Sequence, residues 1–171
     1  MPRVCTRLAT LEQLPPRLRR SPDQRPGVLS KPMQAPHASS EAVRRSMQAN
    51  RRVDTKPELR LRSAIHKRGL RFRKDYLIRV GAISVRADIV FPARRIAVFV
   101  DGCFWHQCPD HGASPRANSD YWRLKLGSNS RRDEAVSKAL REAGWNVARI
   151  WEHEDTIEAA ERICRLVADQ G

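Results

Sequence analysis

Thiol and imidazole side chains gather in one short stretch of the sequence. Cys103, Cys108 and His111 lie within nine residues and offer three soft or borderline metal ligands. A tetrahedral zinc ion needs a fourth ligand, which His153 can supply from the end of another expected strand. We therefore predict a structural zinc site at Cys103, Cys108, His111 and His153. In the alternative interpretation, the two cysteines are reduced thiols of the core.

A second group of side chains offers hard oxygen ligands and one titratable base. Its members are Glu58, Asp88, Asp101, His106 and Asp133. Hydrolysis of a phosphodiester needs such groups, because a hard cation neutralises the developing charge and a general base activates water. The sequence therefore predicts two metal sites of different softness. Glu58 has an alternative role as a carboxylate that complements a helix dipole.

Large aromatic residues adjoin the expected zinc ligands. Phe104 and Trp105 lie between Cys103 and Cys108, and residues of this size usually belong to a core. On a basic protein and among polar ligands, they also fit the apolar wedges that enter a stack of DNA bases. Trp122 is a third candidate for such a wedge.

The composition favours one domain and a polyanionic partner. The chain has 171 residues, of which 40% are hydrophobic, and this is enough for one ordinary core. Its 33 Lys and Arg against 19 Asp and Glu give a net charge of +14, which favours nucleic acid. The alternative is a solvated basic face or a charged tail. Because no apolar run reaches the roughly 18 residues of a membrane span, we expect a soluble intracellular protein with no membrane partner.

The order of the expected elements indicates an α/β domain behind a tail. Residues 1–40 hold seven of the 11 prolines without sustained periodicity, and we predict a disordered basic tail there. Residues 41–171 form the expected domain. Helices are predicted over 41–49, from 54–58 to a stop at Gly69, over 119–126 continuing through 129–143, and from 156 onward; strands are predicted over 70–77, 83–91, 96–100 and 145–151.

Two connections place the acidic residues. The tight basic turn before residue 96 favours an antiparallel pair of strands, which would put Asp88 and Asp101 on adjacent strands. A carboxylate such as Asp88 inside a buried strand needs a cation or donors to remain charged, unless Arg86 is merely its ion-pair partner. The helix before the last strand predicts a βαβ connection.

The segment Gly-Cys-Phe-Trp-His at residues 102–106 is distinctive, and five further segments accompany it in a family's order. These segments are residues 54–59, 86–90, Trp122, 129–133 and 144–152. Over residues 40 to about 155 the chain resembles the very short patch repair (Vsr) mismatch endonucleases. The resemblance implies a restriction-endonuclease-like α/β fold, with a mixed central sheet flanked by helices and a structural zinc site. It also implies magnesium-dependent nicking of duplex DNA on the 5′ side of a thymine mispaired with guanine.

The resemblance also implies roles for single residues. Asp88 resembles the catalytic magnesium-binding aspartate of the family, and the carbonyl of Val100 stands where the family uses a carbonyl for magnesium. His106 resembles the general base, with Glu58 and Asp133 as acids that orient or assist it.

Further positions either match the family or depart from it. Phe104, Trp105 and Trp122 resemble the side chains that wedge into DNA beside the mismatch. Asp101 stands where well-known members have histidine, so it can be an extra magnesium ligand. The zinc ligands are permuted relative to those members, although all four remain competent donors.

The expected cofactors are structural Zn²⁺ and catalytic Mg²⁺, and the expected partner is double-stranded DNA with a T:G mismatch. A monomer in the cytoplasm, associated with the nucleoid and with other mismatch-repair proteins, would fit this function. Two alternatives stay open. One is a restriction-type nuclease of the same fold with another target, and the other is a non-catalytic, zinc-stabilised DNA-binding module.

Overall fold

The structure, a computed structural model, describes residues 35–113 and 115–170. The chain divides into two units, Met1–Gln34 and Ala35–Gly171, and the second unit holds all the elements described below. The predicted tail over residues 1–40 lies outside the described residues except for 35–40. Among the residues that are described, no helix combines the length and apolarity needed to cross a membrane.

A four-stranded mixed sheet forms the centre of the second unit. The elements follow in the order α1 (Glu41–Ala49), α2 (Lys56–Lys67), β1 (Arg73–Val80), β2 (Ile83–Phe91), η1 (Pro92–Arg94), β3 (Ile96–Asp101), α3 (Ser119–Glu142), β4 (Asn146–Trp151) and α4 (Thr156–Ala168). The strand order is β1-β2-β3-β4. The pairs β1–β2 and β2–β3 are antiparallel, whereas β3–β4 is parallel. The predicted α/β fold class is confirmed, and so is the βαβ connection through α3.

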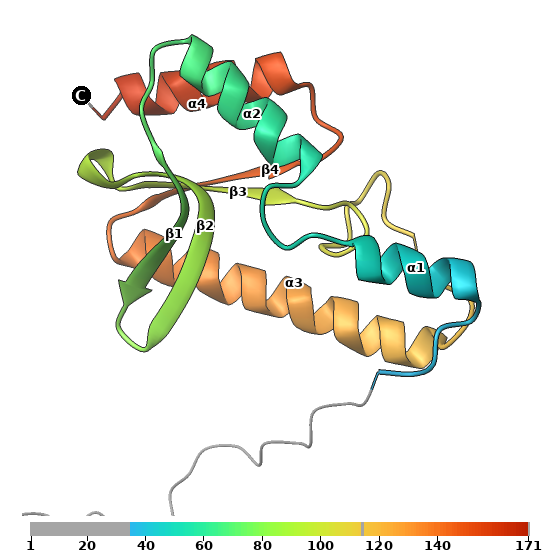
Figure 1. The fold of residues 1–171 in the computed structure, drawn as a ribbon. Helices are drawn as coiled ribbons and strands as arrows, with labels where there is room; N and C mark the ends of the chain where they lie inside the picture. Colours follow the sequence, from blue (N-terminus) through green and yellow to red (C-terminus); the bar gives the residue numbers. More distant parts are fainter. Residues whose placement is uncertain (1–34, 114, 171) are drawn as a thin grey trace, which may run out of the picture. The chain divides into compact units, whose positions relative to one another are not determined.

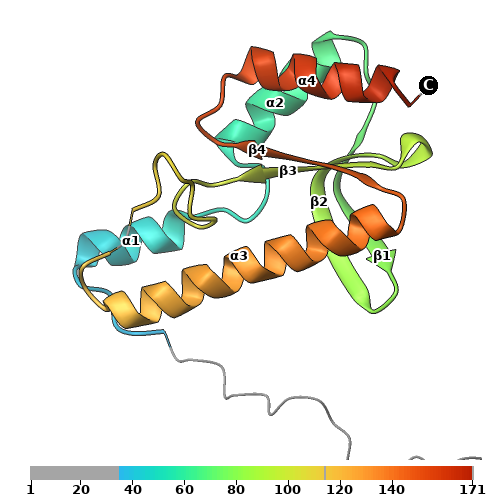
Figure 2. The same ribbon diagram turned by 180° about the vertical axis from the view of Figure 1, so that it is seen from behind.

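Helices cover both faces of this sheet (Figure 1). Alternate residues of β3 point to opposite faces, as the two-residue period of a strand requires. Ile96 and Val98 belong to one core cluster with residues of α2 and α4. Ala97 and Phe99 belong to a second cluster with Leu140 of α3. The strand is therefore buried on both sides, which explains its unbroken apolar sequence. Figure 2 shows α3 crossing the sheet on the face opposite α2 and α4.

The strands β2 and β3 share only a short ladder. Their pairing runs from Phe91↔Ile96 to Ile89↔Val98, while β1 and β2 pair along almost their whole length. The β1–β2 hairpin then curves away from β3, as Figure 1 shows. Asp88 is the first residue of β2 beyond the shared ladder. The predicted placement of Asp88 and Asp101 on adjacent strands is confirmed.

Two local predictions needed correction. The first strand was expected over residues 70–77, but β1 spans Arg73–Val80, because Leu70 and Phe72 already pack against the core before the strand begins. The spacing of the apolar residues in the last helix predicts a buried stripe of Ile157, Ala160, Ile163, Cys164 and Val167, but the side chain of Ile157 is 52% exposed. The buried stripe of α4 consists of Ala159, Ala160, Ile163 and Val167, and Ile157 lies to one side of it.

Candidate active site and metal centre

The parallel pairing of β3 with β4 brings together the two loops that carry the predicted zinc ligands. Asp101 at the end of β3 lies opposite Trp151 at the end of β4. Beyond this pair, the N–H of Glu152 donates to the carbonyl of Asp101 at 2.9 Å. The carboxylate of Glu152 in turn accepts from the N–H of Cys103 at 2.7 Å. The loop after β3 and the loop after β4 are therefore bound to each other at their first residues.

The four predicted zinc ligands converge at this junction. The donor atoms of Cys103, Cys108, His111 and His153 all lie within 4.8 Å of one another. Nδ1 of His153 is 3.0 Å from the sulfur of Cys103 and 3.7 Å from that of Cys108. Ligand bonds of about 2.0–2.3 Å in a tetrahedral zinc site place the donors roughly 3.3–3.8 Å apart. The cluster fits zinc in donor type, number and spacing.

The loop around this cluster is tightly wound. The N–H of Cys108 donates to the carbonyl of Cys103 at 2.9 Å, and the N–H of Gly112 donates to the carbonyl of Cys108 at 2.7 Å. A Cβ atom at Gly112 would lie only 2.5 Å from that carbonyl oxygen. Only glycine fits there without a shift of the backbone, so the turn over residues 108–112, which carries His111, depends on it.

Burial makes the sulfur of Cys103 a poor thiolate unless a cation is present. Burial raises the pKa of the Cys103 thiol to about 11, and the neighbouring Cys108 and Glu152 add to the rise. A bound zinc ion ligates the deprotonated sulfur and supplies the missing positive charge. The cluster is thus suited to a soft or borderline divalent cation, and its donor set is consistent with zinc.

We expect Cys108→Ser to lose the zinc ion and to destabilise the domain by several kcal/mol, because structural zinc sites bind with roughly 10–16 kcal/mol. Zinc content by mass spectrometry and urea unfolding measure the two effects. Cys164→Ser is the matched control, since Cys164 lies on α4 and outside the cluster. One zinc ion per chain retained in Cys108→Ser would contradict the assignment.

Asp88 occupies the gap that opens between β2 and β3. Its Oδ2 accepts the N–H of Val100 at 2.7 Å, in place of the strand partner that the short ladder no longer provides. Burial is the largest cause that raises the pKa of Asp88, to about 6, and the negative charges of Glu58 and Asp101 act in the same direction. A half-buried carboxylate with like charges near it is a good position for a divalent cation.

The raised pKa of Asp88 makes a prediction about stability. The pKa of Asp88 is about 6 in the folded protein and 3.8 for an ordinary aspartate. The ionisation of Asp88 therefore lowers the free energy of unfolding progressively as the pH rises from 3.8 to about 6, with the full cost above pH 6 and none below pH 3.8. In magnesium-free buffer we expect Asp88→Asn to be more stable than the natural protein by roughly 1–3 kcal/mol at pH 8. The difference should shrink toward zero at pH 4. Urea unfolding at both pH values measures it, and a variant that gains nothing at pH 8 would contradict the electrostatic argument.

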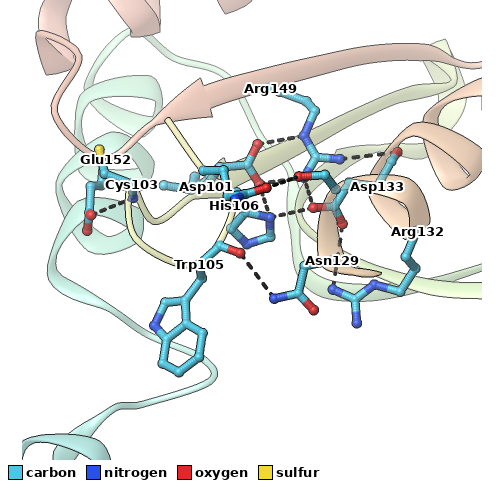
Figure 3. A network of polar contacts seen from close by, with 12 residues as sticks. Asp101, Cys103, Trp105, His106, Asn129, Arg132, Asp133, Arg149 and Glu152 are labelled. Atoms are coloured by element: carbon cyan, nitrogen blue, oxygen red, sulfur yellow. Dashed lines mark hydrogen bonds and ion pairs between the residues drawn. The ribbon is translucent and has the colours of Figure 1, made fainter. Parts of the chain in front are cut away.

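His106 lies beside two carboxylates and is bonded to one of them (Figure 3). Its Nδ1 is 2.5 Å from Oδ2 of Asp133 and 3.7 Å from Oδ1 of Asp101. Burial raises the pKa of Asp133, but its hydrogen bond with His106 and the charge of Arg149 outweigh burial, so the pKa is lowered overall. Asp133 therefore stays ionised next to the imidazole and holds its Nδ1.

Asp101 is almost fully buried and is paired with Arg149. The guanidinium of Arg149 donates through Nε to Oδ2 at 2.5 Å and through Nη2 to Oδ1 at 2.6 Å. Burial lowers the pKa of Arg149, but Asp101 and Asp133 raise it by more, and the net direction is upward. Both oxygens of Asp101 are thus engaged by one bidentate partner.

Glu58 does not contact His106 in the described residues. It is buried at the start of α2, where it pairs with Arg62 and accepts from the N–H of Asp54 at 3.1 Å and from the hydroxyl of Thr55 at 2.8 Å. Its charge acts on Asp88 instead, whose pKa it helps to raise. The expected acid is therefore near the site, but on the side of the Asp88 carboxylate.

The three aromatic candidates form one cluster. The ring of Phe104 lies 5.0 Å from that of Trp105 and 5.3 Å from that of Trp122. All three are partly buried, so they are neither in the central core nor fully in solvent. The amide of Asn129 on α3 donates to the carbonyl of Trp105 at 3.1 Å and fixes the loop against the helix.

Two charged residues of the site were not singled out from the sequence. Arg149 binds Asp101, and Arg62 binds both Glu58 and Asp54. A signal was available for Arg149, since a single arginine in an otherwise apolar strand needs a buried anion. Arg62 offered a weaker signal, because it follows Glu58 by the four residues that align side chains on a helix.

The chain is similar to several known proteins. A profile of the family described as "DNA mismatch endonuclease Vsr" matches residues 38–110. The type II nicking enzyme V.NaeI of Lentzea aerocolonigenes is 57% identical over 116 residues, which cover 67% of this chain and 70% of that protein. The type II nicking enzyme V.XorIIP of Xanthomonas oryzae is 41% identical over 123 residues, or 68% of this chain and 83% of that protein. The DNA mismatch endonuclease Vsr of Escherichia coli is 33% identical over 109 residues, or 63% of this chain and 67% of that protein.

The fold, the site and these matches define an endonuclease, an enzyme that hydrolyses phosphodiester bonds in DNA. More narrowly, the chain belongs to the Vsr DNA mismatch endonuclease family. The family predicted from the sequence is confirmed. The non-catalytic DNA-binding module that stayed open in the sequence analysis is therefore set aside.

Proposed function

We propose that this endonuclease nicks one strand of duplex DNA in a defined sequence context. The two relatives of highest identity described above are named as type II nicking enzymes, which favours this function over general mismatch repair. The observation that carries the proposal is the bonded pair of His106 and Asp133. Asp101 links this pair to Asp88, since it lies 3.7 Å from Nδ1 of His106 and its charge helps to raise the pKa of Asp88. One such centre in a monomer cuts one strand at a time.

In this proposal, the carboxylate of Asp88 and the main-chain carbonyl of Val100 hold magnesium. Both are hard oxygen donors, which magnesium prefers, and the hydrogen bond from Val100 to Asp88 keeps the two residues together. The bound cation would neutralise the negative charge that develops on the scissile phosphate. Glu58 contributes through its charge beside Asp88, which increases the attraction of this position for a cation.

His106 is the general base in this proposal. Asp133 holds Nδ1 of the ring and keeps its own negative charge, so Nε2 is the nitrogen that takes a proton from water. A carboxylate in this position also stabilises the imidazolium that forms when the proton is taken. His106 and Asp133 thus act as one unit.

Asp101 has a different role from the one suggested by the resemblance. Both oxygens of Asp101 accept short hydrogen bonds from Arg149, so the charge of this carboxylate is already neutralised and the guanidinium repels a second cation there. We assign Asp101 as the buried charge partner of Arg149. The pair then supports the site without binding magnesium.

A second candidate function is the repair of T:G mismatches by nicking 5′ of the mispaired thymine. The cluster of Phe104, Trp105 and Trp122 favours it, because aromatic side chains on a basic DNA-binding protein can wedge between bases. A mismatched pair costs less to open than a matched pair, so such a wedge would select mismatches. Other mismatch-repair proteins are then the expected partners.

The test uses labelled duplexes that differ in one pair, T:G or T:A, within a library of flanking sequences. With magnesium, we expect one strand to be cut in a preferred sequence, and the ratio between the T:G and T:A duplexes decides between the two targets. Asp88→Asn should cut at least about 100-fold more slowly, because a bound cation contributes several kcal/mol. The same variant should bind DNA normally and remain folded.

Three results would contradict the proposal. They are cutting of both strands by one centre, full activity of Asp88→Asn, and activity in the absence of any divalent cation. Preferential cutting of T:A duplexes would reject mismatch repair and leave the sequence-directed nicking activity in place. Cutting only of T:G duplexes would instead favour mismatch repair.

A further inference from the structure

One arginine joins three elements behind the histidine. Arg149 lies on β4 opposite Phe99 of β3, and its guanidinium lies over the Phe99 ring at 5.2 Å. From there it reaches the end of β3 at Asp101 and the side of α3, where Nη1 donates to the hydroxyl of Ser137 at 3.4 Å. Its side chain is 25% exposed, so most of it is enclosed by protein.

The same guanidinium faces the two oxygens that lie nearest to His106. Nη2 of Arg149 is 2.6 Å from Oδ1 of Asp101 and 3.4 Å from Oδ2 of Asp133. Nδ1 of His106 is 3.7 Å from that oxygen of Asp101 and 2.5 Å from that oxygen of Asp133. Arg149 and His106 therefore share two carboxylates, and each carboxylate has a preferred partner. Figure 3 shows the arginine and the histidine on either side of this pair.

Without the arginine, this division would not hold. Asp101 is buried to 3% exposure, and a buried carboxylate without a donor is costly. Nδ1 of His106 lies 3.7 Å from Oδ1 of Asp101, roughly half an ångström beyond the usual upper limit of about 3.2 Å for such a hydrogen bond. A small rotation of the imidazole would satisfy Asp101 and break the bond to Asp133.

We propose that Arg149 is a positioning residue that selects Asp133 as the partner of His106 by occupying both oxygens of Asp101. The consequence for catalysis rests on the proposed function, in which His106 is the general base. The imidazole of His106 is then held in one orientation, and its Nε2 points in one direction toward the reacting water. Arg149 itself touches neither DNA nor the reacting atoms in this arrangement.

The first test is Arg149→Met, which keeps much of the volume and removes all donors. We expect kcat for nicking to fall roughly 10–100-fold, because a displacement of about 1 Å in a catalytic group has effects of this size. KM should stay within about threefold, since the arginine does not contact DNA. The kcat of Arg149→Lys should lie between that of Arg149→Met and that of the natural protein, because lysine keeps the charge but cannot form the bidentate pair with Asp101.

The second test is the double variant Arg149→Met with Asp101→Leu, which replaces the buried ion pair by an apolar pair. Such replacements often preserve stability. Because the competing carboxylate is gone, we expect kcat to recover most of what Arg149→Met lost. A double variant as slow as the single one would overturn the proposal, since it would mean that Arg149 only ties β4 to α3 or that Asp101 acts directly.

Arg162→Met is the matched control. Arg162 lies on α4 and donates to the main-chain carbonyl of Arg149 at 3.2 Å, but it pairs with Glu154 and reaches none of the three side chains around Nδ1. We expect this variant to keep the kcat of the natural protein. Zinc content and the unfolding midpoint of every variant check that the fold is retained.

A spectroscopic measurement separates this proposal from the function on which it rests. A ring N–H in a short hydrogen bond to a carboxylate gives a far-downfield proton signal, which His106→Gln assigns by removing it. We expect Arg149→Met to shift or abolish this signal and the double variant to restore it. An unchanged signal in Arg149→Met would overturn the positioning role, whatever happens to activity. A signal that responds as expected while kcat stays constant would support the positioning role and reject His106 as the base.

Discussion

The parallel pairing of β3 with β4 is the interaction on which both centres depend. Parallel strands end at the same edge of a sheet, so the loop after Asp101 and the loop after Trp151 leave side by side. The first loop supplies Cys103, Cys108 and His111, and the second supplies His153. Either loop alone would lack a full set of zinc ligands. The four candidate ligands can therefore meet only if β3 and β4 pair in this register.

The same edge gathers more negative charge than an uncompensated interior could hold. The charge of Asp101 acts on Asp88, and Arg149 lies close to both Asp101 and Asp133, so the three carboxylates belong to one site and each is balanced differently. Asp101 has Arg149 and Asp133 has His106, whereas Asp88 has only one main-chain N–H among its hydrogen-bond donors in the described residues. The acid with the least compensation is the one with the raised pKa, which is why we propose it as the position of an added cation.

Sequence patterns predicted most elements well because β3 and the end of β2 are strongly apolar and the helices have clear ends. Such signals depend only on neighbouring residues: the apolar run over residues 96–100 marks β3, Pro92 ends β2, and Gly69 follows the end of α2. Asp133 was among the acidic candidates, but only the resemblance assigned it to His106, because a carboxylate on a largely polar helix does not indicate its partner. Arg149 was missed for a related reason: its partner Asp101 is distant in sequence, and their pairing depends on strand register. Arg62, the actual partner of Glu58, was missed because the sequence does not show that both residues are buried. Burial makes the two charges depend on each other, which an exposed i,i+4 pair does not require.

X-ray absorption at the zinc edge is the most direct test that two strand ends build one site. The natural protein should show two sulfur ligands at about 2.3 Å and two nitrogen ligands at about 2.0–2.1 Å. His153→Gln should lose one of the two nitrogen ligands and keep both sulfurs, because His153 alone comes from the loop after β4. A ligand set that is the same in His153→Gln, or one without two sulfurs in the natural protein, would contradict the account.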